Sequence, residues 1–484
     1  MFKKIIIVFL YFILALGYAY SATLAQTSLQ GANIGYLDSI KKNDRILILA
    51  PHPDDETIGC AGIIQQAVKE GADIHIVYLT NGDHNEFAFI VYEKRITFRS
   101  NEFVHMGQVR QREALKAAQI LGVDKDNVIF LGYPDFGTFT MFKDYWETDK
   151  PHKSMMTRIS KVPYKNSLSF GAPYVAESIL EDLKTVLLKY RPSKVFVSHP
   201  LDVNSDHKAF YLFLEVALSD LENELPRPDI YPYLVHCPGW PLPRHFHPEL
   251  SLTPPKEFLN LSIYWFKNRL SQEQINKKYE AILAHRSQTR SSAFYLLAFA
   301  RNNELFGGYP EVYLTMPQVN KAVDIRERMS LKDRFAAFLG LSQMFSEKTV
   351  NMSVDSQNPD NDIDNKVKYR VDNTNFIISV SKPKEKVRSV TTLIHLFGYS
   401  KKTPFPVMPK IRIITRYNKI KVFQAGKEID RGEIKLEMPN NELIIKVPLK
   451  LLGEPDFLLA SVRAYNGIPP VHTTGFRKIH IRRE

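Results

Sequence analysis

The chain has 484 residues, of which 44% are hydrophobic and 24% are charged, and its formal net charge is +12. This composition is typical of globular proteins and excludes a disordered chain, and the length predicts two domains rather than one core. The excess of Lys and Arg favours anionic partners such as phosphoglycans or lipid headgroups. No dense Lys/Arg run and no nucleic-acid motif is present. The basic residues are therefore expected to be spread over a solvated surface, and no nucleic-acid role is predicted.

The N-terminus has the layout of a secretory signal peptide. A short basic start (Met-Phe-Lys-Lys) precedes an apolar run over residues 5–19, and small residues follow, including Ser21 and Ala25. This order of basic, apolar and small-residue regions predicts a signal peptide over residues 1–25. The rest of the chain is therefore expected to be exported, to the periplasm or beyond. An uncleaved segment would instead anchor the protein in the membrane, and this is the only membrane contact that we predict.

Strands and helices are expected to alternate over the first part of the chain. The strands are short, continuous apolar runs, which are typical of strands buried on both faces of a parallel sheet. This alternation predicts an α/β fold, with a Rossmann-like, mostly parallel sheet and helices on both of its faces. In chain order, the expected elements are strand 46–50, helix 56–69, strand 74–79, helix 110–121, strand 128–131, helix 176–190, strand 194–198 and helix 207–218.

The second part of the chain has a different residue pattern, in which the alternation of strands and helices ends. A Pro- and aromatic-rich stretch follows residue 220, and helices are expected at 272–283, 291–301 and 326–346. We assign residues 26–345 to the α/β domain with a helical extension, the polar residues 346–368 to a linker, and residues 369–484 to a β-sandwich domain. Short β-branched and aromatic runs separated by turn signals predict this sandwich. The runs are 376–380, 387–396, 411–414, 420–423, 443–447, 458–464 and 476–481.

Two loops rich in imidazole and carboxylate groups follow two of the predicted parallel strands. The first is the segment 52–56 (His-Pro-Asp-Asp-Glu), and the second is 199–207, which ends in Asp206 and His207. Ligand sites in open α/β sheets collect at the carboxyl ends of the strands, and imidazole with carboxylate suits catalytic zinc. Either loop alone is equally well explained by helix capping. Together, at equivalent ends of two strands, they favour a metal site.

With these motifs the sequence resembles the LmbE-like deacetylases, a family that includes the PIG-L enzyme of GPI-anchor synthesis. The family pattern of a strand, Ala-His-Pro-Asp-Asp-Glu and a helix stands here as residues 50–56, Ala-Pro-His-Pro-Asp-Asp-Glu. The resemblance covers roughly residues 40–300. Further similar segments, in order, are 79–83 (Leu-Thr-Asn-Gly-Asp), 110–113 (Arg-Gln-Arg-Glu), 131–135 (Leu-Gly-Tyr-Pro-Asp), 200–207 and 285–288 (His-Arg-Ser-Gln).

The resemblance implies a zinc-dependent hydrolase that removes the acetyl group from an N-acetylated sugar such as N-acetylglucosamine. Amide hydrolysis at neutral pH needs a strong nucleophile, and Zn²⁺ lowers the pKa of a bound water to about 7. A carboxylate beside a ligand can accept the water proton and return it to the leaving amine. The residues implied are His52, Asp55 and His207 as zinc ligands, Asp54 as general base, and Arg110 and Asp135 as substrate contacts.

One position departs from the commonest family pattern. Many members carry a second His three residues before the last ligand, where it helps to stabilise the oxyanion or to protonate the leaving group. Here that position is Asn204, and Asp206 stands where the family's supporting Asp does. An amide can donate a hydrogen bond to an oxyanion, but it cannot supply a proton. We therefore assign Asn204 a catalytic role as a donor and expect the acid role to fall on Asp54.

Two further features of the sequence can each be interpreted in two ways. The segment 233–241 contains His236, Cys237 and Trp240, which would line a sugar pocket or belong to a Pro-rich loop packed on the core. We favour the packed loop slightly. His285 would face the site or have a core or capping role.

We predict an exported zinc N-deacetylase acting on an N-acetylated glycan or glycolipid. Two alternatives stay open: a zinc amidase that cleaves a larger amide conjugate, and an inactive glycan-binding envelope protein. Asn204 is the feature that allows the inactive protein. The full set of His52, Asp55, His207 and Asp54 argues against it, because an inactive site need not keep both ligands and base.

Overall fold

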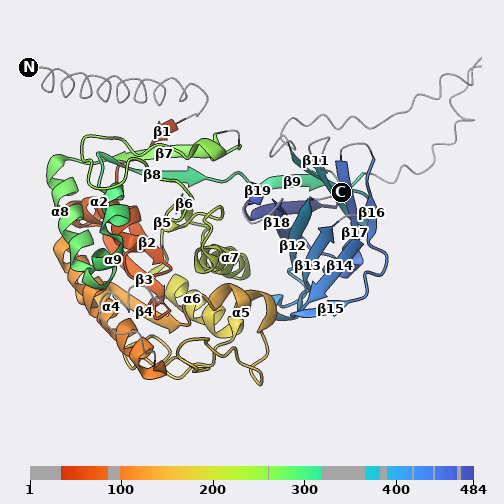
Figure 1. Cartoon of the computed structure of the whole chain (residues 1–484), viewed down its shortest axis with the longest axis horizontal. Helices are drawn as coiled ribbons and strands as arrows, with labels where there is room; N and C mark the ends of the chain where they lie inside the picture. The colour runs from red at the N-terminus through yellow and green to blue at the C-terminus, as the bar shows by residue number, and fades with distance from the viewer. Residues whose placement is uncertain are drawn as a thin grey trace, which may run out of the picture.

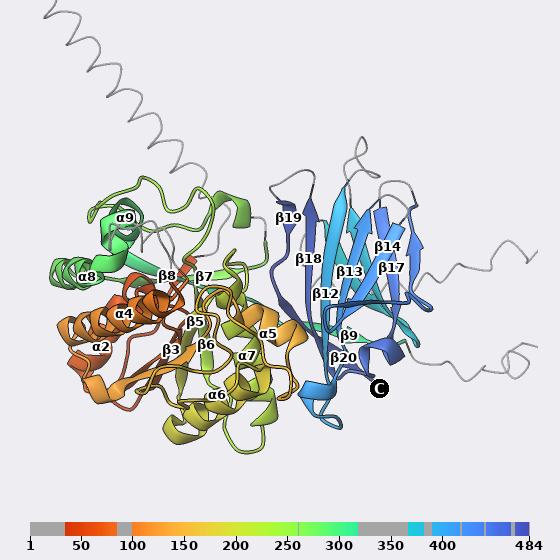
Figure 2. The same cartoon turned by 60° about the horizontal axis from the view of Figure 1, so that its bottom comes forward.

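The computed structural model describes residues 34–84, 99–259, 261–317, 366–381, 390–416, 419–439, 442–465 and 470–483. In these residues the chain forms an α/β unit and a β-rich unit that lie side by side (Figures 1 and 2). The predicted signal peptide over 1–25, the helix expected at 326–346 and most of the predicted linker over 346–368 lie outside the described residues. Among the helices of the described ranges, none combines the length and the apolar character that a membrane span needs.

The α/β unit is built on an eight-stranded sheet with the order β1-β7-β8-β6-β5-β2-β3-β4. The strands from β6 to β4 are parallel, whereas β8 runs antiparallel to β6 and β7. The predicted mostly parallel sheet is therefore confirmed. The strands are β1 (Ile34–Tyr36), β2 (Arg45–Ala50), β3 (Asp73–Thr80), β4 (Val128–Tyr133), β5 (Lys194–Ser198), β6 (Asp229–Tyr233), β7 (Tyr264–Arg269) and β8 (Asn303–Gly308).

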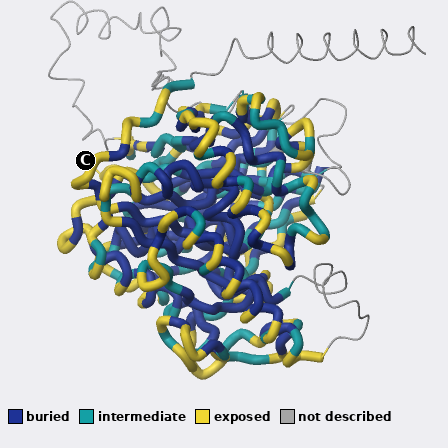
Figure 3. Tube along the Cα trace, turned by 90° about the vertical axis from the view of Figure 1, so that its left-hand side faces the viewer, coloured by how far each residue is buried: buried dark blue, intermediate teal, exposed yellow. Residues whose placement is uncertain are grey.

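Helices cover both faces of this sheet, as predicted. Alternate residues of β2 point to opposite faces: Ile46 and Ile48 join one buried cluster, and Leu47 and Leu49 join the other. Figure 3 shows that buried residues run through the interior while exposed residues lie on the outside. On the first face lie α2 (Asp55–Glu70), α4 (Ser100–Leu121), α8 (Gln272–Ala284) and α9 (Arg286–Leu296). On the second lie α5 (Thr138–Asp144), α6 (Ala176–Tyr190) and α7 (Ser205–Asp220).

One helix begins earlier than the sequence predicts. The helix expected at 110–121 is α4, which starts at Ser100, so Arg110 lies in the middle of the helix and not at its start. The buried face of α4 includes Phe103, Met106 and Arg110. Gly107 lies within the first turns, and glycine has a low intrinsic helix propensity, so the segment before Arg110 carries a weak helix signal.

The β-rich unit is a sandwich of two sheets. The smaller sheet has the order β10-β11-β17-β16, and the larger has the order β15-β14-β13-β12-β18-β20-β9, with β19 paired to β18. Both sheets contribute to one apolar core, which includes Phe376 and Ile445 from the smaller sheet and Ile394 and Val462 from the larger. The strands are β9 (Val312–Thr315), β10 (Val367–Val371), β11 (Asn375–Ser381), β12 (Thr391–Tyr399), β13 (Lys410–Arg416), β14 (Lys419–Gln424), β15 (Lys427–Ile429), β16 (Lys435–Glu437), β17 (Glu442–Pro448), β18 (Phe457–Tyr465), β19 (Pro470–Thr473) and β20 (Arg477–Arg482).

The sandwich takes one strand from the segment that precedes the predicted linker. β9 pairs in parallel with β20 at the edge of the larger sheet. Since β8 ends at Gly308 and β9 begins at Val312, the chain passes from one unit to the other within a few residues.

An apolar contact joins the two units. Phe142 of α5 lies 5.4 Å from Phe397 of β12 and 5.6 Å from Phe405, measured between ring centroids. Phe457 and Phe476 belong to the same buried cluster. Aromatic pairs at such distances add to the free energy of burial, so α5 and α7 are packed firmly against the larger sheet.

A buried ion pair crosses the same contact. The carboxylate of Glu215 in α7 lies 2.8 Å from Arg227 Nη2 and 3.2 Å from Lys478 Nζ of β20. Burial alone would raise the pKa of Glu215, but these two cations hold it below its usual value. The charged form is therefore the one that the folded protein stabilises.

Replacing Glu215 should test this link between the units. Glu215→Gln removes the nearest carboxylate of the buried Lys478 and of the partly exposed Arg227, which keep only Glu311, at 4.0 Å and 3.2 Å. We therefore expect a loss of about 2 kcal/mol in the free energy of unfolding. A folded-state pKa below the usual 4.5 means that the effect is present above that pH and lost as the pH falls further. Urea unfolding at several pH values measures both.

The matched control is Glu147→Gln, which removes an exposed carboxylate 3.3 Å from Lys150. We expect a change within about 0.5 kcal/mol for this surface pair. Equal effects of the two variants would show that Glu215 does not hold the units together.

Candidate functional site

The two predicted loops meet at one edge of the α/β sheet. β2 and β5 are parallel neighbours, so the segments that follow Ala50 and Ser198 emerge at the same edge. Asp55 begins α2, and His207 lies in the first turn of α7. Both helices therefore start at this edge and direct their first side chains towards each other.

Three of the residues that the sequence singled out come together around one carboxylate. Asp55 Oδ2 lies 3.2 Å from His52 Nδ1 and 3.1 Å from His207 Nε2, and it accepts a 2.9 Å hydrogen bond from the His52 backbone. His236 completes the group, since all four residues place a ligand-type atom within 4.8 Å of one another. His52, Asp55 and His207 are buried, and His236 is half-buried. This buried group could hold a metal ion.

The state of His207 supports a metal at this group. Neither ring nitrogen makes a hydrogen bond of acceptable angle, although each is buried and lies 3.1 Å from a carboxylate oxygen. A buried polar atom without a partner is costly, and a cation held between the imidazole and carboxylate groups would remove that cost. Nitrogen and oxygen donors of this kind suit zinc and related divalent ions.

Asp202 fixes the orientation of His207 from behind. Its Oδ2 lies 3.1 Å from His207 Nδ1, which leaves Nε2 directed at Asp55. The same oxygen accepts hydrogen bonds from the backbone nitrogens of Val235, at 3.2 Å, and His236, at 2.8 Å. Burial alone would raise the pKa of Asp202, but His207 and His236 bring it to about 2. A carboxylate behind a histidine ligand is a common support for metal sites.

His236 was considered from the sequence for a sugar pocket or a packed loop, and its place in the metal group was not predicted. It lies just after β6, which is the parallel neighbour of β5, so it emerges at the same edge as the two loops. Its ring centroid is 4.7 Å from that of His207. Its position directly after a strand could have indicated a site residue. However, β6 is difficult to predict from the sequence, because it contains Pro232 and proline is rare within a sheet.

Asp54 has an unusual backbone conformation, and its carboxylate pairs with Arg110 and not with the start of α2. Its φ of 123° lies in a region that non-glycine residues rarely adopt, and its side chain makes no capping hydrogen bond to α2. Oδ2 instead lies 3.4 Å from Arg110 Nη2. Burial raises the pKa of Asp54 to about 6, against the opposing charge of Arg110. A strained residue held beside a candidate metal group is consistent with a functional role.

Arg110 and Asp135 both contact residues of the segment 52–56, next to the metal group. Arg110 also donates to the carbonyl oxygens of Gly82, at 3.1 Å, and Pro53, at 2.6 Å. Asp135 Oδ1 lies 3.0 Å from His52 Nε2. Both residues therefore contact the loop that carries the metal group.

A second group that could hold a metal uses the other ring nitrogen of His52. It consists of His52, Asp135 and Asp206. Asp206 already accepts hydrogen bonds from the backbone nitrogens of Phe136, at 2.6 Å, and Thr138, at 3.2 Å. Because its oxygens are engaged by these donors, we take the group around Asp55 as the candidate metal centre.

Asn204 caps a helix. Its Oδ1 accepts a 2.8 Å hydrogen bond from the backbone nitrogen of Asp206, which makes it the N-cap of α7. The side-chain NH₂ group is left for other partners. His285 lies 3.4 Å from Glu56 Oε1 and 3.2 Å from Thr57 Oγ1 and is buried, so it packs against the start of α2 and does not belong to the metal group.

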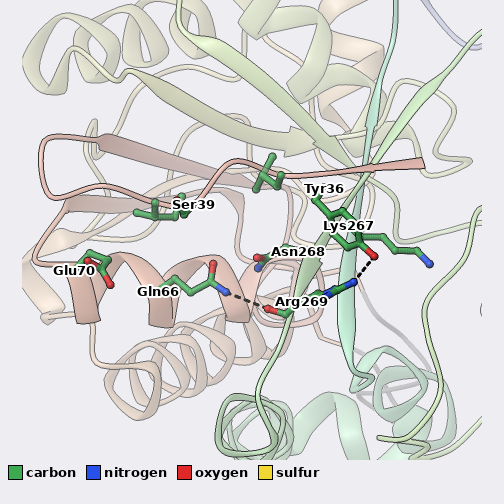
Figure 4. Close-up of a pocket in the computed structure, with 9 residues that line it drawn as sticks. Tyr36, Ser39, Gln66, Glu70, Lys267, Asn268 and Arg269 are labelled. Carbon is green, nitrogen blue, oxygen red and sulfur yellow. Dashed lines mark hydrogen bonds between the residues drawn. The ribbon is translucent and has the colours of Figure 1, made fainter. Parts of the chain in front are cut away.

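An open hollow elsewhere on the α/β unit is remote from this site. Tyr36, Gln66 and Arg269 help to line it, and Figure 4 shows the hydrogen bond from Arg269 to the Tyr36 hydroxyl. Gln66 is 11 positions after Asp55 on α2, or roughly 16 Å along the helix axis. The hollow therefore lies near the opposite edge of the sheet from the metal group.

A family model matches the part of the chain that carries this site. Residues 47–218 match the model described as "PIG-L: GlcNAc-PI de-N-acetylase". The matched segment begins in β2 and ends in α7, and it includes His52, Asp55 and His207.

Curated relatives and a solved structure are similar to parts of the chain. A glucosamine-6-phosphate deaminase-like protein from Bacteroides thetaiotaomicron is 23% identical over 286 residues, which is 52% of this chain and 36% of that protein. A 1D-myo-inositol 2-acetamido-2-deoxy-alpha-D-glucopyranoside deacetylase from Mycobacterium sp. is 34% identical over 90 residues, which is 19% of this chain and 28% of that protein. The alignments thus span about a third of these relatives' own lengths. N,N'-diacetylchitobiose deacetylase from Pyrococcus horikoshii aligns over 51% of this chain and 72% of that chain, with 20% identity and a TM-score of 0.30.

Metal analysis tests the candidate centre directly. We expect one divalent ion per chain in the wild-type protein and loss of that ion in His207→Gln. A chelator should lower the free energy of unfolding by about 2.7 kcal/mol if free metal was present at a hundred times its dissociation constant. Elemental analysis and thermal unfolding with and without chelator provide the two measurements.

His75→Gln is the control, because His75 lies near the start of β3, away from the edge that carries the site. It should keep the full metal content. Equal metal content in the two variants would contradict the assignment of His207.

Proposed function

We propose that the chain is a PIG-L/LmbE-like deacetylase, because the family model matches residues 47–218, and that it acts as a zinc-dependent N-deacetylase of an N-acetylated glycan or glycolipid. The observation that carries this proposal is the meeting of His52 and His207 at one oxygen of Asp55, with Asp54 beside them. The mycobacterial relative is named for deacetylating an acetamido sugar, which supports a sugar substrate here. We also propose export, on the strength of the N-terminal sequence.

The residues of the chain supply the parts that amide hydrolysis needs. His52, Asp55 and His207 would hold the zinc ion, which would supply a Lewis acid for the acetyl carbonyl and for the attacking water. Asp54 is placed to accept the proton of the attacking water and to give it to the leaving nitrogen. The C–N bond then breaks, and acetate and the free amino sugar leave.

Arg110 and Asp135 have positioning roles in this proposal. The guanidinium of Arg110 lies against Asp54 and ties it to the carbonyl of Pro53. The carboxylate of Asp135 lies against His52 and orients its ring. Since their charged atoms already have these partners, positioning is better supported than the substrate contact expected from the sequence.

His236 is the candidate for the role that many family members give to a histidine at the position of Asn204. It is half-buried, lies beside His207 and is held by Asp202 through its backbone. We propose that it faces the acetyl oxygen and stabilises the negative charge that develops there. Asn204 then serves mainly as the cap of α7.

Acetate release from a panel of N-acetylated substrates tests the deacetylase proposal. We expect the wild-type protein to release acetate from at least one chitooligosaccharide, small glycoside or glycolipid. Asp54→Asn removes the base but no ligand, so it should lower kcat by about a thousandfold while the metal content stays unchanged.

The control for this variant is Asp73→Asn, at the other end of the strand that pairs with β2. It should keep wild-type activity. Release of acetate by Asp54→Asn at the wild-type rate would exclude Asp54 as the base, and no acetate from any substrate with the metal bound would overturn the deacetylase proposal.

A pair of variants separates the roles of His236 and Asn204. His236→Gln should lower kcat by about a hundredfold through the loss of oxyanion stabilisation. Asn204→Ala should instead lower the free energy of unfolding by about 1 kcal/mol through the loss of the helix cap, with the smaller effect on kcat. Steady-state kinetics and urea unfolding of both variants decide between the residues, and a larger loss of kcat in Asn204→Ala would reverse the assignment.

A further inference from the structure

The face of the larger sheet that covers the α/β unit has two chemically different halves. Phe397 and Tyr399 of β12 and Phe457 and Leu459 of β18 lie in the apolar cluster shared with α5 and α7. Side chains alternate along a strand, so the next residues on this face are polar. They are His395 of β12 and Ser461 and Arg463 of β18.

The strand register brings a second arginine to the polar half. His395 pairs with Arg412 of β13 on one side and with Ser461 of β18 on the other. Ile411 and Ile413 point into the core of the sandwich, so Arg412 points to the opposite face. His395, Arg412, Ser461 and Arg463 therefore form one polar surface at the contact between the units.

A small cavity lies between this surface and the α/β unit. The sandwich contributes His395, Arg463 and Phe476, and the α/β unit contributes Phe139 of α5 and Lys208 of α7. A neighbouring cavity is lined by Lys143 and Asp144 of α5 and by residues of the sandwich that include Lys410 and Arg412. Both cavities thus bring cationic side chains from the two units towards each other.

The positive charge around these cavities has little carboxylate to balance it. Lys143 lies 3.6 Å from Asp144, but among the described residues no carboxylate lies within ion-pair distance of Lys208, Arg412 or Arg463. Arg412 Nε is buried without a hydrogen-bond partner. Arg412 and Arg463 are half-buried, and the buried Lys208 donates to the Val203 carbonyl oxygen. Charge removed from water without a counter-charge is costly, so an anion bound here would offset part of that cost.

The behaviour of His395 agrees with this account. His395 is 9% exposed, and burial together with the charges of Lys143, Arg463, Arg412 and Lys208 holds its pKa well below the usual value. The protein thus keeps this imidazole uncharged among cations. An anion in the cavity would relieve the repulsion between the cations.

The cavity lies next to the candidate metal centre. Lys208 directly follows the proposed ligand His207 on α7. Phe139 directly follows Thr138, whose backbone nitrogen donates to Asp206. Pro200, which also lines the cavity, belongs to the loop that leads to His207. The same loop and helix start thus carry residues of the cavity and of the metal group.

We propose that this cavity, the interdomain anion site, binds a carboxylate, sulfate or phosphate group of the glycan whose N-acetyl sugar is the substrate. The claim that the bound group belongs to a glycan substrate rests on the proposed function. The claim that the cavity binds an anion does not depend on it. It names the substrate class as an acidic N-acetylated glycan, and it gives the sandwich a part in choosing that substrate.

Binding of two matched tetrasaccharides tests the proposal. Hyaluronan tetrasaccharide alternates glucuronate with N-acetylglucosamine, whereas chitotetraose carries N-acetylglucosamine alone. We use the metal-loaded full chain with Asp54→Asn to prevent turnover, and isothermal titration calorimetry at low salt, where charge contacts are strongest. We expect at least tenfold tighter binding of the acidic tetrasaccharide.

Arginine variants then locate the preference. Arg463→Gln and Arg412→Gln should each reduce it at least fivefold, and Arg463→Lys should keep part of it. Lys435→Gln, on exposed β16 of the other sheet, should leave it unchanged, and thermal unfolding shows whether each variant is folded. Equal affinity for the two tetrasaccharides, or a preference that survives both arginine variants, overturns the proposal.

Two further arms separate the outcomes. Inorganic sulfate that raises the unfolding temperature of the wild type but not of Arg463→Gln, without any preference for the acidic tetrasaccharide, would mean a site for free anions and overturn the substrate claim. Acetate release from chitotetraose by the wild type tests the deacetylase proposal separately. A preference for the acidic tetrasaccharide without acetate release from any substrate would keep the anion site and reject the deacetylase.

Discussion

The Asp55 carboxylate joins the two halves of the candidate site. Its Oδ2 accepts the backbone N–H of His52 and lies close to a ring nitrogen of both His52 and His207. The two imidazoles come from loops after different strands, so their approach depends on β2 and β5 being parallel neighbours. A sheet order that separated these strands would leave each loop with an incomplete set of ligands. A whole parallel sheet is therefore needed to bring a few side chains together.

The charges around this carboxylate explain why a cation fits. Asp54, Asp55, Asp135, Asp202 and Asp206 are all buried at the same edge, and Arg110 is the guanidinium that lies against one of them. Burying several carboxylates together is costly unless each has a partner. Backbone nitrogens provide partners for Asp202 and Asp206, whereas Asp55 has two imidazoles and one backbone nitrogen. A divalent ion between these imidazoles and Asp55 would balance the remaining negative charge.

The sequence predicts the parts of the molecule whose signal is local. One short segment is enough to predict each of β2, β3, β4 and β5, because each strand is a continuous apolar run. The loops after β2 and β5 are predicted in the same way.

Features that arise only when distant segments meet were not predicted. β7 and β8 pair with each other across a long connection, and His236 joins the metal group because β6 lies beside β5. The contacts of Arg110 with Asp54 and of Asp135 with His52 likewise depend on which loops the sheet brings together, so the resemblance gave the residues without their partners. Asn204 was assigned only a donor role from the sequence, whereas the structure shows its side chain as the N-cap of α7.

The larger sheet of the sandwich has two buried faces. Alternate residues of its strands point into the sandwich core and towards the α/β unit. Along β12, Ile394 and Leu396 fill the core of the sandwich, while His395 and Phe397 face the α/β unit. The aromatic half of the outward face provides the packing that holds the units together. If docking were the only task of this face, apolar residues throughout would hold the units together at lower cost, because unpaired cations weaken a buried contact. The cations are concentrated instead in the half that adjoins the start of α7, where His207 lies. This division of one sheet face is better explained by a ligand that reaches from the metal group to the sandwich than by packing alone.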